Sequence, residues 1–277
     1  MAIQSANTIP TNKHVLVCGM TGTGKSYLCE QYLARYEYVV KLDTKDETTE
    51  RQLAGVSAWD GLEENKDFTI VRNIDLLDDV ETKKIIYSPP YDEQNEETFN
   101  RFFRWCFERT NTLIWIDELM SIGTVQKYPR ELGRVMTQGR SKNVGVWACT
   151  QRPSGIPSIV PSNCSYFFVF NMALPQDRKK LVEVTGMVEM YDWPNGYNFW
   201  YYKMGEEKPV KAVLVKNWCL IWNIKNKRRY IMDNKFLGVG LTNVIGIALF
   251  TMLVSVILKV IFTKYEVEGI SQVVRTA

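Results

Sequence analysis

The chain has 277 residues, 45% of them apolar and 23% charged, an ordinary globular composition that allows an α/β core of about 230 residues plus an appendage. A formal net charge of +3 does not by itself indicate a nucleic-acid-binding protein, so any such contact has to be local. Six scattered cysteines without a C-x-x-C pair, and a polar start without a secretory signal, argue against a disulfide framework and a zinc site.

The first strong signal follows a polar segment, 1–12, which we expect to be a disordered arm. An apolar run at 14–18 predicts a strand, and residues 19–26, GMTGTGKS, fit the P-loop pattern G-x-x-x-x-G-K-[ST] at every fixed position. Glycines let backbone N–H groups turn inward onto phosphate oxygens, and the helix expected at 27–35 points its positive end to the same place. The alternative is a glycine-rich turn without a ligand.

The P-loop pattern assigns roles to individual side chains. Lys25 is expected to reach the β- and γ-phosphates of ATP, and the Ser26 hydroxyl to complete the ligand shell of Mg²⁺. The residues expected to bind the nucleotide are Gly19, Met20, Thr21, Gly22, Thr23, Gly24, Lys25, Ser26 and Tyr27.

The next segments alternate between strands and helices. Apolar runs predict strands at 38–42, 68–72 and 84–87, with a charged surface helix and loop at 44–67. Residues 95–109 predict an amphipathic helix with its apolar positions at 99, 102, 103, 106 and 107. Strands separated by helices pair in parallel through crossovers, so we expect an α/β fold whose mainly parallel central sheet carries helices on both faces.

A second motif follows this helix. The apolar strand expected at 112–116 ends in Asp117 and Glu118, which is the Walker B pattern of ATP-hydrolysing P-loop proteins. A buried parallel strand delivers its last side chains to the edge where the P-loop opens, so Asp117 is expected to hold magnesium through water. Glu118 is expected to orient and deprotonate the attacking water. The alternative, a simple helix cap, is disfavoured by the P-loop upstream.

Polar residues also follow the strand expected at 143–151. Its end places Gln151 beside the γ-phosphate, where the amide could sense it. The preceding segment, 128–142, predicts an arginine-bearing helix, and Arg140 and Arg152 are the best placed to enter a neighbouring subunit's site as an arginine finger. That role requires an oligomer, and the alternative for each arginine is a solvated surface charge.

The region from 174 to 235 carries no motif. We expect a helix at 174–186, ended by a glycine, and strands at 197–203 and 208–216 that complete the sheet. The segment 191–222 is aromatic, which suits stacking on bases or meeting a partner, although core packing is the more common use of such residues.

The tail contains a candidate membrane helix. Residues 238–258 form 21 consecutive positions without a charge, and a helix of them spans roughly 30 Å, the thickness of a bilayer's hydrocarbon core. We therefore expect a P-loop ATPase domain at 13–235, a transmembrane helix at 236–262 and a short tail at 263–277. Lys and Arg are more numerous before this helix than after it, which puts the ATPase domain on the cytoplasmic side. The alternative is a buried core helix.

Three segments together resemble a known superfamily. GMTGTGKS at 19–26, LIWIDEL at 113–119 and QGRSKNVGVWACTQRPSGIPSIVPSNCSYFFVF at 138–170 resemble the FtsK-HerA superfamily of hexameric DNA-pumping ATPases. Within this superfamily, the chain is similar in its small size to the genome-packaging ATPases of tailless icosahedral viruses with an internal membrane. The resemblance covers about residues 13–172 and implies a RecA-like fold.

The resemblance also implies roles and partners. Lys25 and Ser26 become phosphate and metal ligands, and Asp117 becomes the magnesium acid. The catalytic residues that the resemblance implies are Lys25, Glu118, Gln151 and Arg140. The implied assembly is a hexameric ring that drags double-stranded DNA by its phosphates, without reading sequence, into a preformed capsid. Its partners are then capsid vertex or portal proteins and a membrane, either the host inner membrane or the virion's internal one.

Two other functions stay open. The membrane helix is a departure from the packaging enzymes, and it also occurs in Zot-like filamentous-phage assembly proteins, which drive phage extrusion but usually continue beyond the membrane. A different class is a membrane-tethered ATP-binding scaffold that performs no translocation. The acid pair ending in Glu118 favours hydrolysis over such a scaffold.

Overall fold

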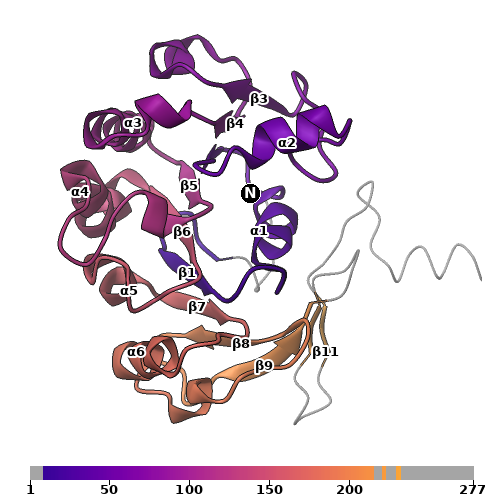
Figure 1. The fold of residues 1–277 in the computed structure, drawn as a ribbon, viewed down its shortest axis with the longest axis vertical. Helices are drawn as coiled ribbons and strands as arrows, with labels where there is room; N and C mark the ends of the chain where they lie inside the picture. Colours follow the sequence, from indigo (N-terminus) through magenta and orange to yellow (C-terminus); the bar gives the residue numbers. More distant parts are fainter. Residues whose placement is uncertain (1–8, 215–219, 223–228, 232–277) are drawn as a thin grey trace, which may run out of the picture. The chain divides into compact units, whose positions relative to one another are not determined.

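A central β-sheet organises the part of the chain that the computed structural model describes, residues 9–214, 220–222 and 229–231 (Figure 1). Its strands are β1 (Val15–Cys18), β2 (Val39–Leu42), β3 (Phe68–Val71), β4 (Lys84–Tyr87), β5 (Leu113–Ile116), β6 (Gly145–Thr150), β7 (Tyr166–Val169), β8 (Asn198–Lys203) and β9 (Val210–Val213). Their spatial order is β3-β4-β2-β5-β6-β1-β7-β8-β9, within the compact unit Ala6–Tyr230. Two further strands, β10 (Leu220–Trp222) and β11 (Arg229–Ile231), pair with each other.

The direction of the strands explains where a site can form. From β3 to β7 every neighbouring pair is parallel, whereas β8 runs antiparallel to β7 and β9 antiparallel to β8. The carboxyl ends of β1, β2, β5 and β6 therefore open at one edge of the sheet. The predicted α/β fold with a mainly parallel central sheet is confirmed.

Helices cover both faces of the sheet, as expected. They are α1 (Lys25–Leu33), α2 (Glu47–Leu53), α3 (Glu96–Arg109), α4 (Arg130–Gln138), α5 (Ile159–Asn163) and α6 (Pro175–Thr185). Short 3-10 turns are η1 (Ile74–Asp79), η2 (Tyr91–Glu93), η3 (Leu119–Ser121), η4 (Gly139–Lys142) and η5 (Val188–Tyr191). Figure 1 shows α1 and α2 on one face and α3 to α6 on the other.

The core has one layer on each face of the sheet because successive side chains of a strand alternate between the faces. On the α1 side Trp147 of β6 packs against Tyr32, with ring centroids 4.8 Å apart. On the other side α3 buries the apolar positions predicted for it, Phe99, Phe102, Phe103, Cys106 and Phe107. The Asn95 side chain accepts a hydrogen bond from the Thr98 N–H at 3.1 Å and so caps this helix.

Several boundaries differ from the expectations. The helix expected at 27–35 begins at Lys25, directly after Gly24, and the helix expected at 128–142 ends at Gln138 and continues as η4. Between β6 and β7 lies α5, whose Pro161 sits in the first turn, where a helix needs no N–H donor.

Part of the expected disordered arm is folded. Ile9 is buried, its N–H donates to the Tyr32 hydroxyl at 3.2 Å, and its carbonyl accepts from the Tyr36 hydroxyl at 2.6 Å. These contacts fasten Ile9 to Tyr32 of α1 and to Tyr36 just beyond that helix. Residues 1–8 lie outside the described part of the chain.

The expected membrane helix at 236–262 and the tail at 263–277 also lie outside the described residues. Among the helices that the structure describes, none combines the length and the apolar character needed to cross a bilayer.

Candidate functional site

The turn between β1 and α1 has the tight course that a phosphate-binding loop needs. Gly19 has a φ of 156°, and a Cβ atom there would lie 2.6 Å from the Cβ of Phe170. Gly24 has a φ of 100° immediately before α1, and a Cβ atom would lie 2.5 Å from a methyl of Leu214. At Gly19 a side chain would collide with Phe170 as well as strain the backbone, and at Gly24 the positive φ favours glycine.

The Lys25 side chain lies inside this loop and contacts its backbone. Its ammonium donates hydrogen bonds to the carbonyls of Gly19 at 2.7 Å and Met20 at 2.9 Å. The side chain is buried, and burial lowers the pKa of the ammonium from its usual value. A cation held at the centre of a loop of N–H donors is the arrangement that binds a polyphosphate.

Ser26 and Asp117 meet although 91 positions separate them in the sequence, as expected. The Ser26 hydroxyl donates to Oδ1 of Asp117 at 3.2 Å, and Asp117 is 1% exposed. The second carboxylate oxygen, Oδ2, is buried and accepts no hydrogen bond. A hydroxyl oxygen beside a buried carboxylate is the donor set that Mg²⁺ prefers, so these two residues fit the expected metal.

The P-loop and the second acid are connected through Gln151. The Thr21 hydroxyl donates to the side-chain oxygen of Gln151 at 3.0 Å, and the Gln151 amide donates to Oε2 of Glu118 at 3.2 Å. Glu118 is 6% exposed, and its other oxygen, Oε1, has no hydrogen-bond partner. The predicted base and the predicted sensor thus lie in direct contact.

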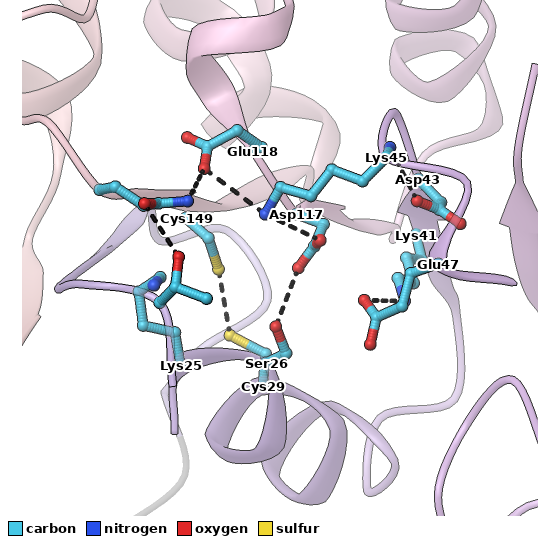
Figure 2. A network of polar contacts seen from close by, with 12 residues as sticks. Lys25, Ser26, Cys29, Lys41, Asp43, Lys45, Glu47, Asp117, Glu118 and Cys149 are labelled. Atoms are coloured by element: carbon cyan, nitrogen blue, oxygen red, sulfur yellow. Dashed lines mark hydrogen bonds and ion pairs between the residues drawn. The ribbon is translucent and has the colours of Figure 1, made fainter. Parts of the chain in front are cut away.

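Sequence reasoning missed Lys45, which bridges the two acids (Figure 2). Its ammonium lies 3.4 Å from Asp117 Oδ2 and 3.5 Å from Glu118 Oε2. Burial alone would lower the pKa of Lys45, but the two carboxylates outweigh it and raise the pKa. Asp43 holds the turn that carries Lys45, since it accepts the N–H of Lys45 at 3.1 Å and that of Thr48 at 2.8 Å.

Replacing Lys45 with methionine is expected to lower the melting temperature of the nucleotide-free full chain by about 2–4 °C, equivalent to about 1 kcal/mol. The loss stays small because Lys45 is 38% exposed and water screens the pair. Mg²⁺ alone should raise the melting temperature of the variant more than that of the unmodified chain, since the lysine no longer competes for Asp117. Thermal unfolding with and without Mg²⁺ measures both effects.

The control is Lys66→Met, which removes an exposed lysine paired with Glu63 and far from the acids in the sequence. Its response to Mg²⁺ should equal that of the unmodified chain. An identical Mg²⁺ response in the Lys45 and Lys66 variants would show that Lys45 does not compete with Mg²⁺ for Asp117.

The two candidate arginine fingers lie in different settings. Arg152 follows the sensor, and its Nε donates to the buried Asp177 at 2.9 Å, so it is engaged within its own subunit. Arg140 is exposed in η4, next to the start of β6. This is the amino edge of the sheet, opposite the P-loop, and so Arg140 does not reach the site of its own subunit.

A cleft of about 450 Å³ opens over the P-loop. It is lined by Thr21, Gly22, Gly24, Lys25, Ser26, Tyr27, Lys45, Gln151, Tyr197 and Leu214. Six of the nine residues expected to bind the nucleotide are among them. The other three, Gly19, Met20 and Thr23, lie in the turn itself, where the Thr23 hydroxyl donates to the Met20 carbonyl at 2.7 Å. Tyr197 and Leu214 belong to no motif that the sequence showed.

Comparisons with known proteins agree with this geometry. No curated protein matches the chain. Among solved structures, the genome packaging NTPase B204 from Sulfolobus turreted icosahedral virus 2, in complex with ATP-gammaS, matches with a TM-score of 0.60 at 14% identity, over 75% of this chain and 100% of that chain. B204, the DNA-packaging ATPase from Sulfolobus Turreted Icosahedral Virus, matches with a TM-score of 0.59 at 17% identity and the same coverage. At these identities the matches establish the fold.

The family is established by a sequence match. Residues 15–172, more than half of the chain, match the model of the ATPase family associated with various cellular activities (AAA). The match begins at β1 and ends just after β7, so it includes the P-loop, both acids and Gln151. The expected P-loop ATPase, with a fold shared by viral genome-packaging NTPases, is confirmed: the chain belongs to the AAA family and is an ATPase.

Proposed function

We propose that this ATPase packages a viral genome by moving double-stranded DNA into a preformed capsid, as an oligomeric ring, expected to be a hexamer. One observation carries the proposal: the match with B204 covers the whole of that genome-packaging chain at a TM-score of 0.60. The cleft supports it, because the phosphate loop and the hydrolytic acids lie together at one edge of the sheet.

The side chains divide the hydrolytic step among them. Ser26 and Asp117 would hold Mg²⁺, which supplies positive charge to the phosphate oxygens. Glu118 takes a proton from the water that attacks the γ-phosphate, and Gln151, between Glu118 and the P-loop, reports whether that phosphate is present. Arg140 of a neighbouring subunit would stabilise the charge that develops on the transferred group.

Anchoring and location are part of the same proposal. Residues 236–262 would cross a membrane with the ATPase domain on its cytoplasmic side. The ring would stand at a packaging vertex, in the host inner membrane or the virion's internal membrane, beside capsid vertex or portal proteins.

The test measures ATP hydrolysis by the full chain reconstituted in lipid vesicles, without DNA and with double- or single-stranded DNA. Double-stranded DNA of any sequence should raise turnover several-fold, and added salt should weaken the effect because phosphate contacts dominate. Lys25→Ala is the inactive control. A rate unaffected by either DNA would support the non-translocating scaffold, and stimulation by single strands alone would contradict duplex packaging.

A further inference from the structure

The nucleotide cleft has one wall that the catalytic residues do not use. Tyr197, directly before β8, and Leu214, directly after β9, line it together. Both lie beyond residue 172, where the match to the AAA family ends. We propose that Tyr197 and Leu214 form the base site, which holds purine nucleotides by stacking and does not distinguish adenine from guanine. This inference rests on the nucleotide site of the proposed function.

The sheet order places this wall on the opposite side of the P-loop from the chemistry. The P-loop follows β1, while Glu118 and Gln151 follow β5 and β6 on one side of β1. Tyr197 and Leu214 flank β8 and β9, on the other side, beyond β7. A triphosphate lying along the loop with its γ-phosphate toward Glu118 therefore directs its nucleoside toward Tyr197 and Leu214.

The wall is fixed against the phosphate loop. The Leu214 N–H donates to the Tyr197 carbonyl at 2.9 Å, which ties the two residues together. A Cβ atom on Gly24 would lie 2.5 Å from Leu214 and 3.6 Å from the Tyr197 ring. When the phosphates of a nucleotide occupy the P-loop, its nucleoside can therefore reach Tyr197 and Leu214.

Exposure and chemistry decide what the wall can hold. Leu214 is 7% exposed and forms a fixed apolar surface, whereas Tyr197 is 60% exposed and keeps a large part of its ring open to a ligand. A flat base stacks on such a ring, and one base–aromatic stack contributes about tenfold or more to affinity.

Four polar side chains of the cleft lie on the phosphate side. Among the described lining residues, the side chains of Lys25, Ser26, Lys45 and Gln151 engage the P-loop carbonyls or the two acids. The described wall offers no amide or carboxylate that would read the edge of a base. Stacking accepts any purine, because adenine and guanine both present the same flat face.

The test compares the equilibrium affinities of the full chain for Mg·ATP, Mg·GTP and inorganic tripolyphosphate. The unmodified chain should bind the two nucleotides within a few-fold of each other. Tyr197→Ala should weaken both by about tenfold or more, and leave tripolyphosphate binding unchanged. Tyr197→Phe keeps the ring and should bind like the unmodified chain, as should Tyr91→Ala, which truncates a tyrosine that is 90% exposed outside the cleft.

Each contrary result has a distinct meaning. Unchanged nucleotide affinity in Tyr197→Ala overturns the base site, and so does an equal loss of tripolyphosphate affinity, which would indicate a damaged phosphate loop. A large preference of the unmodified chain for ATP over GTP overturns the lack of discrimination. If the unmodified chain bound none of the three ligands, the nucleotide site of the proposed function would fail instead.

Discussion

Replacing Glu118 with glutamine is expected to lower ATP turnover by about 10²–10⁴-fold, the usual contribution of a positioned general base. Glutamine has nearly the same size, and its side-chain oxygen still accepts the hydrogen bond that Gln151 donates. What disappears is the negative charge, and with it the ability of the carboxylate to take a proton from water. Mg·ATP binding should persist, because Lys25, Ser26 and Asp117 are unchanged.

Steady-state hydrolysis and equilibrium binding of Mg·ATP measure the two halves of this expectation. The matched control is Glu131→Gln, a buried glutamate on α4 that pairs with Arg104 and Arg134 and does not line the cleft. It should keep its turnover. Normal turnover in Glu118→Gln would place the base elsewhere, and a parallel loss of ATP binding would mean that Glu118 serves binding and not the chemical step.

The strands β1, β5 and β6 could be predicted because each is a short apolar run buried on both faces of the sheet. β5 and β6 show no exposed side chain, so nothing in them competes with the β pattern. Their order in space could not be predicted in the same way. Parallel pairing follows from the alternation of strands and helices, but the position of β6 between β5 and β1 depends on packing between segments that are far apart in the sequence.

The same limit explains which part of the site could be predicted. Ser26 belongs to the P-loop pattern and Asp117 to the Walker B pattern. Because both patterns bind the same nucleotide and metal, they have to lie close together in the fold. Lys45 follows β2, and its contact with Asp117 exists because β2 lies beside β5, which no local pattern reveals. The rule used for the ends of β5 and β6, applied to the end of β2, points to Asp43, which holds the turn that carries Lys45. Tyr197 had no comparable signal.

The position of Arg140 makes its expected role unusually easy to test. η4 ends at Lys142, and Asn143 follows it in the left-handed conformation with a φ of 56°. The Val144 N–H then donates to the Gly139 carbonyl at 2.9 Å before β6 begins. The nucleotide cleft lies past the other end of β6, beyond Thr150. If Arg140 acts in hydrolysis, it therefore acts on the site of another subunit.

Arg140→Ala is accordingly expected to lower turnover by about 10³–10⁵-fold, the range for an arginine finger supplied in trans, with Mg·ATP binding retained. Lys142→Ala is the control, because it removes an exposed cation from the same short turn and should leave turnover unchanged. Normal turnover in Arg140→Ala would reduce Arg140 to a solvated surface charge. Loss of ATP binding would indicate a folding defect in place of a missing finger.

A mixing experiment separates action in trans from every effect within one subunit. Arg140→Ala subunits keep a working site, and Lys25→Ala subunits keep the arginine, so each variant alone should be inactive. In a ring of head-to-tail interfaces assembled from equal amounts of both, about a quarter of the interfaces pair a working site with a neighbour's arginine. Hydrolysis should return to about that fraction. Such recovery would show action in trans, because a neighbour cannot repair a defect that is confined to a single subunit. A mixture that assembles and stays inactive would contradict the finger.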